Sequence, residues 1–216
     1  MLHMPSNQKK PSILESMSLD QATSFAQQKS EKGFIREAIN IYRYILKQDY
    51  TNQKALREIN ILTAGSPITV SDEQNPSRQK IKMLISLYKQ GEYNNLLEQL
   101  IQILDQFPNS ALLYSILGAG NLALQKFQPA IENFKNAIAI DPLNSENYNN
   151  LGLTLQRKGE LDKAVKTYKQ ALILNEDFAE AHYNLGNALK EKSKVFDAID
   201  HYKRAIQSKP DYAKAH

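Results

Sequence analysis

A spacing of 34 residues dominates the C-terminal two thirds of this sequence. The segments 113–145, 147–179 and 181–213 align with one another at that offset, and a further step back reaches 79–111. Four consecutive units therefore occupy 77–110, 111–144, 145–178 and 179–212 without an inserted residue. A fixed period of this length indicates a stack of short supersecondary units, each of which buries its apolar face against its neighbours.

Equivalent positions in these units carry side chains of similar size. Small residues recur as Gly118, Gly152 and Gly186 in the first half of a unit, and as Ala130, Ala164, Ala198, Ala137, Ala171 and Ala205 in the second half. An aromatic position holds Phe134, Tyr168 and Tyr202, and Pro108, Pro142 and Pro210 come near the end of a unit. Unit 77–110 departs from this pattern with Leu84, Leu96, Leu100 and Ile103. Small residues let two antiparallel helices approach closely, and proline turns the chain after a helix.

This period and these positions resemble the tetratricopeptide-repeat (TPR) family. The resemblance implies an all-α solenoid of helix–turn–helix units that forms a right-handed superhelix with a concave groove. The layout is also similar to the N-terminal TPR array of long bacterial multi-repeat proteins that carry a downstream transferase domain. No such domain is found within these 216 residues.

The N-terminal third follows the repeat less closely. Residues 19–52 fit a degenerate unit in which Lys29 and Tyr50 depart from the pattern, and 53–62 reads as a short helix. We therefore divide the chain into a disordered N-terminus (1–17), a degenerate TPR-like unit plus short helix (19–62), a linker (63–76) and the repeat array (77–216), which ends with the start of a further unit. The linker is assigned because 63–76 is rich in turn-forming residues.

The composition excludes several classes of function. The chain has no cysteine, which rules out a disulfide framework, thiolate catalysis and cysteine-ligated metal. Its formal net charge is +4, and lysine and arginine are interleaved with acidic residues, so we expect no nucleic-acid partner. No apolar run approaches the roughly 18 residues of a membrane span, and the N-terminus lacks the apolar core of a secretory signal. We expect a cytoplasmic protein without membrane insertion.

The histidines and glycines form no catalytic or metal-binding pattern. His182 and His216 stand where the TPR family often has a large aromatic residue, and His201 falls on an outer helix face. No histidine pair has the i, i+4 spacing of a metal site, and the glycines are isolated rather than gathered in a phosphate-binding loop. We expect no catalytic residue, no metal and no cofactor, and therefore no enzyme.

The resemblance also implies which residues face the concave groove. The register of the units places these partner contacts at Arg78, Lys82, Tyr88, Ser115, Ala119, Leu122, Asn149, Asn150, Leu153, Arg157, Tyr183, Asn184 and Asn187. A surface that is apolar in the middle and polar later suits an extended peptide or a helix. Asn150 and Asn184 occupy the same point of successive units, and similar asparagines in O-GlcNAc transferases form a ladder that holds a peptide backbone. The alternative is that asparagine is simply tolerated on an exposed face.

Three functions remain open at this stage. We favour a non-catalytic adaptor or assembly scaffold that binds a protein or peptide partner in the groove. The alternative is the substrate-recognition arm, or a fragment, of a larger transferase of the glycosyltransferase or sulfotransferase type. The third is self-association through the C-terminal helix, because without a capping unit this helix is expected to expose Ile199, Tyr202 and Ile206. Continuation of the array in a longer protein would cover the same face.

Overall fold

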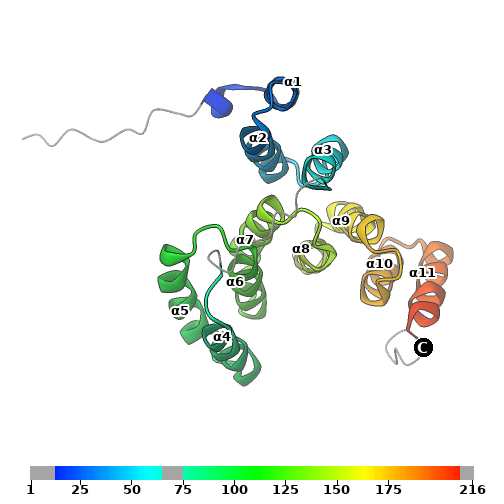
Figure 1. The fold of residues 1–216 in the computed structure, drawn as a ribbon. Coiled ribbons are helices and arrows are strands. Elements are labelled where there is room, and N and C mark those ends of the chain that lie inside the picture. The colour runs from blue at the N-terminus through cyan, green and yellow to red at the C-terminus, as the bar shows by residue number, and fades with distance from the viewer. Residues whose placement is uncertain (1–12, 65–74, 210–216) are drawn as a thin grey trace, which may run out of the picture.

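The computed structural model describes residues 13–64 and 75–209, and every regular element within them is helical (Figure 1). A short 3-10 helix, η1 (Ile13–Ser16), precedes the α-helices. These are α1 (Leu19–Glu31), α2 (Ile35–Gln48), α3 (Gln53–Ala64), α4 (Arg78–Gln90), α5 (Tyr93–Gln106), α6 (Ala111–Ala123), α7 (Phe127–Ile140), α8 (Ser145–Arg157), α9 (Leu161–Leu174), α10 (Ala179–Glu191) and α11 (Val195–Ser208). The predicted all-α repeat fold is confirmed.

Two expected boundaries differ from the observed ones. Residues 13–16 were expected to be disordered but form η1, and α3 continues through Ala64 rather than ending at 62. Residues 1–12 of the predicted disordered segment, 65–74 of the linker and 210–216 at the end of the chain lie outside the described residues.

The two helices of each unit are joined by a turn in which one residue adopts the left-handed backbone conformation, with positive φ. Gly91 and Gly159 fill this position with φ of 77° and 88°, whereas the next unit in each case uses Gln125 or Ser193, with φ of 57° and 59°. Glycine adopts this conformation without steric cost and other residues do not. The turn geometry is therefore kept even where the glycine is lost.

Within a unit, the helices meet where an aromatic ring lies on a glycine. A Cβ added to Gly118, Gly152 or Gly186 would lie 2.5 to 2.8 Å from the nearest ring carbon of Phe134, Tyr168 or Tyr202 respectively. The expectation that Tyr202 would be an exposed residue of the last helix is corrected, because its ring is half-buried against α10. Unit 77–110 has the fully buried Leu84 and Leu100 at these two positions, which belong to a separate leucine-rich cluster.

The helices α4 to α11 form a curved array with an inner and an outer layer (Figure 1). The first helices of successive units, α4, α6, α8 and α10, contact one another directly, and each second helix packs against the first helix of the following unit. The helices α4, α6, α8 and α10 therefore line the concave side, and α5, α7, α9 and α11 form the convex side.

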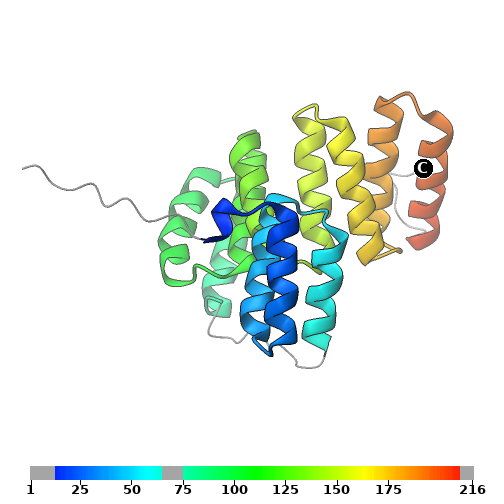
Figure 2. The same ribbon diagram turned by 90° about the horizontal axis from the view of Figure 1, so that it is seen from above.

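The N-terminal helices lie on the convex side and not at the start of the array. α2 packs against α7, and Figure 2 shows α1 to α3 in front of the array when it is seen from above. Tyr50 Oη lies 3.2 Å from Thr167 Oγ1, and Gln53 donates a hydrogen bond to Gln170, so the turn after α2 and the start of α3 are tied to α9. Buried residues of α1 to α3 join those of α6 to α11 in one hydrophobic core.

Candidate functional site

The concave face brings together most of the residues predicted to contact a partner. Ten of the thirteen keep at least part of their side chain accessible: Arg78, Lys82, Tyr88, Ser115, Ala119, Asn150, Leu153, Arg157, Tyr183 and Asn187. They come from α4, α6, α8 and α10, which lie side by side along the inner layer. We call this surface the concave groove.

Three predicted groove residues are buried instead. Leu122, Asn149 and Asn184 are 8%, 2% and 8% exposed. Asn184 Nδ2 donates to Asn149 Oδ1 at 3.0 Å, and Asn149 Nδ2 donates to Glu180 Oε1 at 3.4 Å. Because a buried amide needs hydrogen-bond partners, this bond across the α8–α10 contact provides one for the donor of Asn184 and one for the acceptor of Asn149. The burial of Asn184 favours a structural role for this residue, whereas Asn150, its predicted partner in the ladder, stays partly accessible.

The charge of the concave groove changes along the array. α4 carries Arg78, Lys80, Lys82 and Lys89 and no acidic residue, and α6 has no charged residue at all. Glu146, Glu180 and Glu191 on α8 and α10 accompany Arg157 and Lys190. The groove is therefore basic at its α4 end, apolar at α6 and mixed beyond it.

The charge of Arg157 on α8 influences Tyr88 on α4. Partial burial raises the pKa of Tyr88, and Tyr93 raises it further. The positive charge of the Arg157 guanidinium on α8 lowers it. The rings of Tyr88 and Tyr93 pack edge to face, with 5.5 Å between their centroids. The groove thus has a polar aromatic side chain between its basic and apolar parts.

Two histidines form a hydrogen-bonded pair between α10 and α11. His182 Nδ1 lies 3.0 Å from His201 Nδ1, and His182 Nε2 lies 2.9 Å from Glu176 O. Because a carbonyl oxygen only accepts, His182 Nε2 carries the proton, and in the neutral pair its Nδ1 accepts from His201. Burial lowers the pKa of both imidazoles, that of His201 to about 4. His201 was expected on an outer face, but it is half-buried against His182.

Among residues 13–64 and 75–209, no three histidine, cysteine, aspartate or glutamate side chains are grouped so that they would hold a metal ion. None of the helices described is long and apolar enough to cross a membrane.

Sequence comparison identifies the repeat directly. Residues 133–166 and 179–212 each match a tetratricopeptide-repeat profile, and 157–193 match a TPR-repeat profile. Together with the helix–turn–helix array, these matches show that residues 133–212 consist of TPR repeats. No curated protein sequence is a significant match to it.

Several solved TPR structures share this architecture. The crystal structure of MamA is 25% identical, with a TM-score of 0.53, and the match covers 88% of this chain and 96% of MamA. YrrB, described as a TPR protein with an unusual peptide-binding site, is 18% identical with a TM-score of 0.54 over 92% of this chain and 90% of its own. TTC0263, a thermophilic TPR protein from Thermus thermophilus, is 19% identical with a TM-score of 0.55 over 92% and 95% of the two chains. These likenesses show the fold, and none of them points to a transferase.

Proposed function

We propose that this chain is a non-catalytic binding module that holds an extended peptide segment of a partner protein in the concave groove, as an adaptor or assembly scaffold. TPR arrays are in general protein–protein interaction modules, and YrrB is described as having a peptide-binding site. The single observation that carries the proposal is the position of α1 to α3. They occupy the convex side at α7 and α9, and no other described element covers the inner faces of α4, α6, α8 and α10.

The chemistry of the concave groove indicates the kind of peptide. Arg78 and Lys82 are exposed one turn apart on α4 and form no salt bridge among the described residues. The large side chains of Tyr88 and Leu112 follow, and both are partly exposed (38% and 39%). A peptide with one or two acidic residues followed by a large apolar residue complements this order of charge and hydrophobicity.

Selection from a phage-displayed library of random peptides tests this proposal. We expect enriched sequences to carry Asp or Glu next to Leu, Ile or Phe. The binding of a selected peptide should fall at least tenfold in the double variant Arg78→Glu, Lys82→Glu, because two attractive charges become repulsive.

The matched control is the pair Lys203→Glu, Arg204→Glu on the outer helix α11, which changes the net charge equally. No enriched sequence, or an equal loss of binding in both double variants, would show that the concave groove does not select a peptide. Cytoplasmic location, and the alternative that the bound segment is the substrate of an attached transferase, remain proposals.

A second role, self-association through α11, has its own support. Val195 and Ile199 are 52% and 41% exposed, whereas Leu161 and Val165 at the equivalent positions of α9 are half-buried. Light scattering should then show dimers that Ile199→Glu dissociates, and a monomer at all concentrations would remove this proposal.

A further inference from the structure

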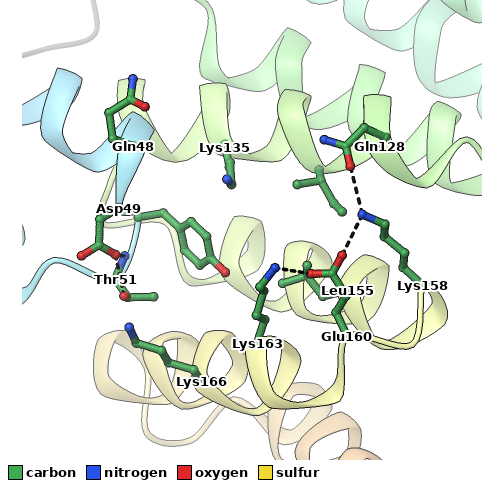
Figure 3. Close-up of a pocket in the computed structure, with 12 residues that line it drawn as sticks. Gln48, Asp49, Thr51, Gln128, Lys135, Leu155, Lys158, Glu160, Lys163 and Lys166 are labelled. Carbon is green, nitrogen blue, oxygen red and sulfur yellow. Dashed lines mark hydrogen bonds and ion pairs between the residues drawn. The ribbon is translucent and has the colours of Figure 1, made fainter. Parts of the chain in front are cut away.

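A second hollow lies on the opposite side of the array, where the N-terminal helices meet α7 to α9 (Figure 3). It has a volume of about 360 Å³. Residues 48–51, at the end of α2 and in the turn after it, form one wall, and the other walls come from α7, from α8 and from α9 with the turn before it. Its lining residues are Gln48, Asp49, Tyr50, Thr51, Gln128, Ile131, Lys135, Leu155, Lys158, Glu160, Lys163 and Lys166. We call this hollow the lysine cleft.

The lysine cleft has more positive than negative charge. Four lysines line it, against the two carboxylates Asp49 and Glu160. Both carboxylate oxygens of Glu160 form ion pairs with lysines. Lys158 Nζ lies 2.7 Å from Oε1 and Lys163 Nζ lies 2.6 Å from Oε2. Figure 3 shows both ion pairs at one end of the cleft, away from Lys135 and Lys166.

The second carboxylate, that of Asp49, accepts hydrogen bonds from a residue of its own turn. Asp49 Oδ1 accepts from the backbone N–H of Thr51 at 3.1 Å and from Thr51 Oγ1 at 2.7 Å. Lys135 and Lys166 have no carboxylate within salt-bridge distance among the described residues. The contact recorded for Lys135 Nζ is with the ring of Tyr50, whose centroid lies 5.4 Å away. Two ammonium groups therefore face the cleft without a counter-charge from the described part of the chain.

The positive charge of the cleft comes from lysine, because none of the residues that line it is an arginine. A lysine ammonium group binds phosphate as a point charge, as it does in phosphate-binding loops. Two of them match the charge of a phosphate monoester, which is close to −2 at neutral pH.

The size of the lysine cleft indicates that the ligand is larger than inorganic phosphate. Its volume lies at the lower end of the range of small-molecule sites, about 300 to 1,000 Å³. Tyr50, Ile131 and Leu155 are among the residues that line it, and Ile131 and Leu155 are buried. These apolar groups offer a surface to the organic part of a ligand.

We propose that the lysine cleft binds a phosphate monoester, with the phosphate between Lys135 and Lys166 and the organic part against Tyr50, Ile131 and Leu155. The site is independent of the concave groove. Such a ligand touches both the turn after α2 and the helices α7 and α9, so its binding strengthens the attachment of α1 to α3 to the array.

Isothermal titration calorimetry at low salt with O-phosphoserine as the probe tests the proposal. We expect saturable binding near neutral pH that falls at least tenfold in Lys135→Gln and in Lys166→Gln. Lys203→Gln, which removes the same charge from the exposed surface of α11, should change the affinity less than twofold. Unphosphorylated serine should not bind. Circular dichroism melts establish that each variant is folded.

Two probe arms distinguish the sources of the phosphate. Tighter binding of the peptide acetyl-Ala-phosphoserine-Ala-amide than of free O-phosphoserine would indicate a modified protein, and the reverse would indicate a small metabolite; both support the site. No binding of either probe at millimolar concentration, or an equal loss in Lys203→Gln, would overturn it. A second readout is hydrogen exchange, in which O-phosphoserine should slow the amides of α2 and α3 in the wild type and not in Lys166→Gln.

Discussion

Replacing Gly152 with alanine probes the contact that sets the distance between α8 and α9. The new Cβ would lie 2.7 Å from Cδ1 and Cε1 of Tyr168 and 3.1 Å from its Cγ. Tyr168 is fully buried, and its hydroxyl donates to Gln156 Oε1 at 2.8 Å. The ring is therefore held at both ends, and the two helices must move apart.

The magnitude follows from three opposing effects. Overpacking of a well-packed core costs about 1 to 3 kcal/mol. Displacement of the ring weakens the Tyr168–Gln156 hydrogen bond, which is worth about 1 kcal/mol. Alanine in place of glycine favours the helix by about 1 kcal/mol. The free energy of unfolding should therefore fall by about 2 kcal/mol.

Urea unfolding followed by circular dichroism measures this change, and Gly120→Ala is the matched control. Its Cβ would lie 3.2 and 3.3 Å from Cδ2 of Leu97 and Leu96, the flexible ends of leucine side chains. We expect Gly120→Ala to be neutral or slightly stabilising, because the methyl groups can yield while the helix gains.

A double-mutant cycle shows whether the ring is the cause. In a Tyr168→Leu background, Gly152→Ala should no longer destabilise, because the leucine lacks the rigid ring. Unit 77–110 has leucine at both of these positions, Leu84 and Leu100. Stabilisation by Gly152→Ala in the wild type, or the same loss in both backgrounds, would refute the reasoning.

The remaining predictions concern buried polar pairs. Acid should weaken the contact of α10 with α11: the folded pKa of His201, about 4, lies below the ordinary value of 6.5, so the unfolded chain binds more protons between these values. The contribution of neutral His201 to the free energy of unfolding is therefore present above about pH 6.5 and is lost as the pH falls toward 4. This loss amounts to about 2 kcal/mol after allowance for partial exposure. Urea unfolding at neutral pH and near the folded pKa measures this loss, and His201→Leu should reduce it. Asn184→Ala should cost about 1 to 3 kcal/mol, because it leaves Asn149 Oδ1 buried without its donor. Asn150 is half-buried at the same point of the preceding unit, and Asn150→Ala should change the free energy of unfolding by no more than about 0.5 kcal/mol. Equal losses in the two variants would contradict the structural role of Asn184.

The repeat array could be predicted from the sequence because each of its rules is local. The period places two helices in every unit, and glycine and alanine at fixed points identify where the helices approach. Helix positions therefore follow once the register is known. Even the departures in unit 77–110 agree with this logic, because Leu84 and Leu100 replace the glycine and the aromatic residue together.

The accessibility of individual groove residues could not be predicted in the same way. Register places Asn149 and Asn184 on an inner helix, but it does not show that two amides from successive units reach one another. Their hydrogen bond depends on the distance between α8 and α10, which is set by packing along the whole array. Two residues at the same register position can therefore differ in accessibility. Asn150 is partly accessible, whereas Asn184, at the same point of the next unit, is buried.

The placement of α1 to α3 illustrates what a periodic pattern leaves out. Gly33 with φ of 80° and the buried Ala26, Ala38 and Tyr42 make α1 and α2 a hairpin of the repeat type. The pattern does not state where this hairpin packs. Tyr50 departs from the repeat at a position where three of the four other units carry proline. Its hydroxyl contacts Thr167 and its ring contacts Lys135. Burial accordingly raises the pKa of Tyr50. The repeat positions account for packing within and between units, so a residue that breaks the pattern is free to form a contact that the repeat does not make. In this chain that contact holds α1 to α3 on the convex side, so no described element covers the concave groove.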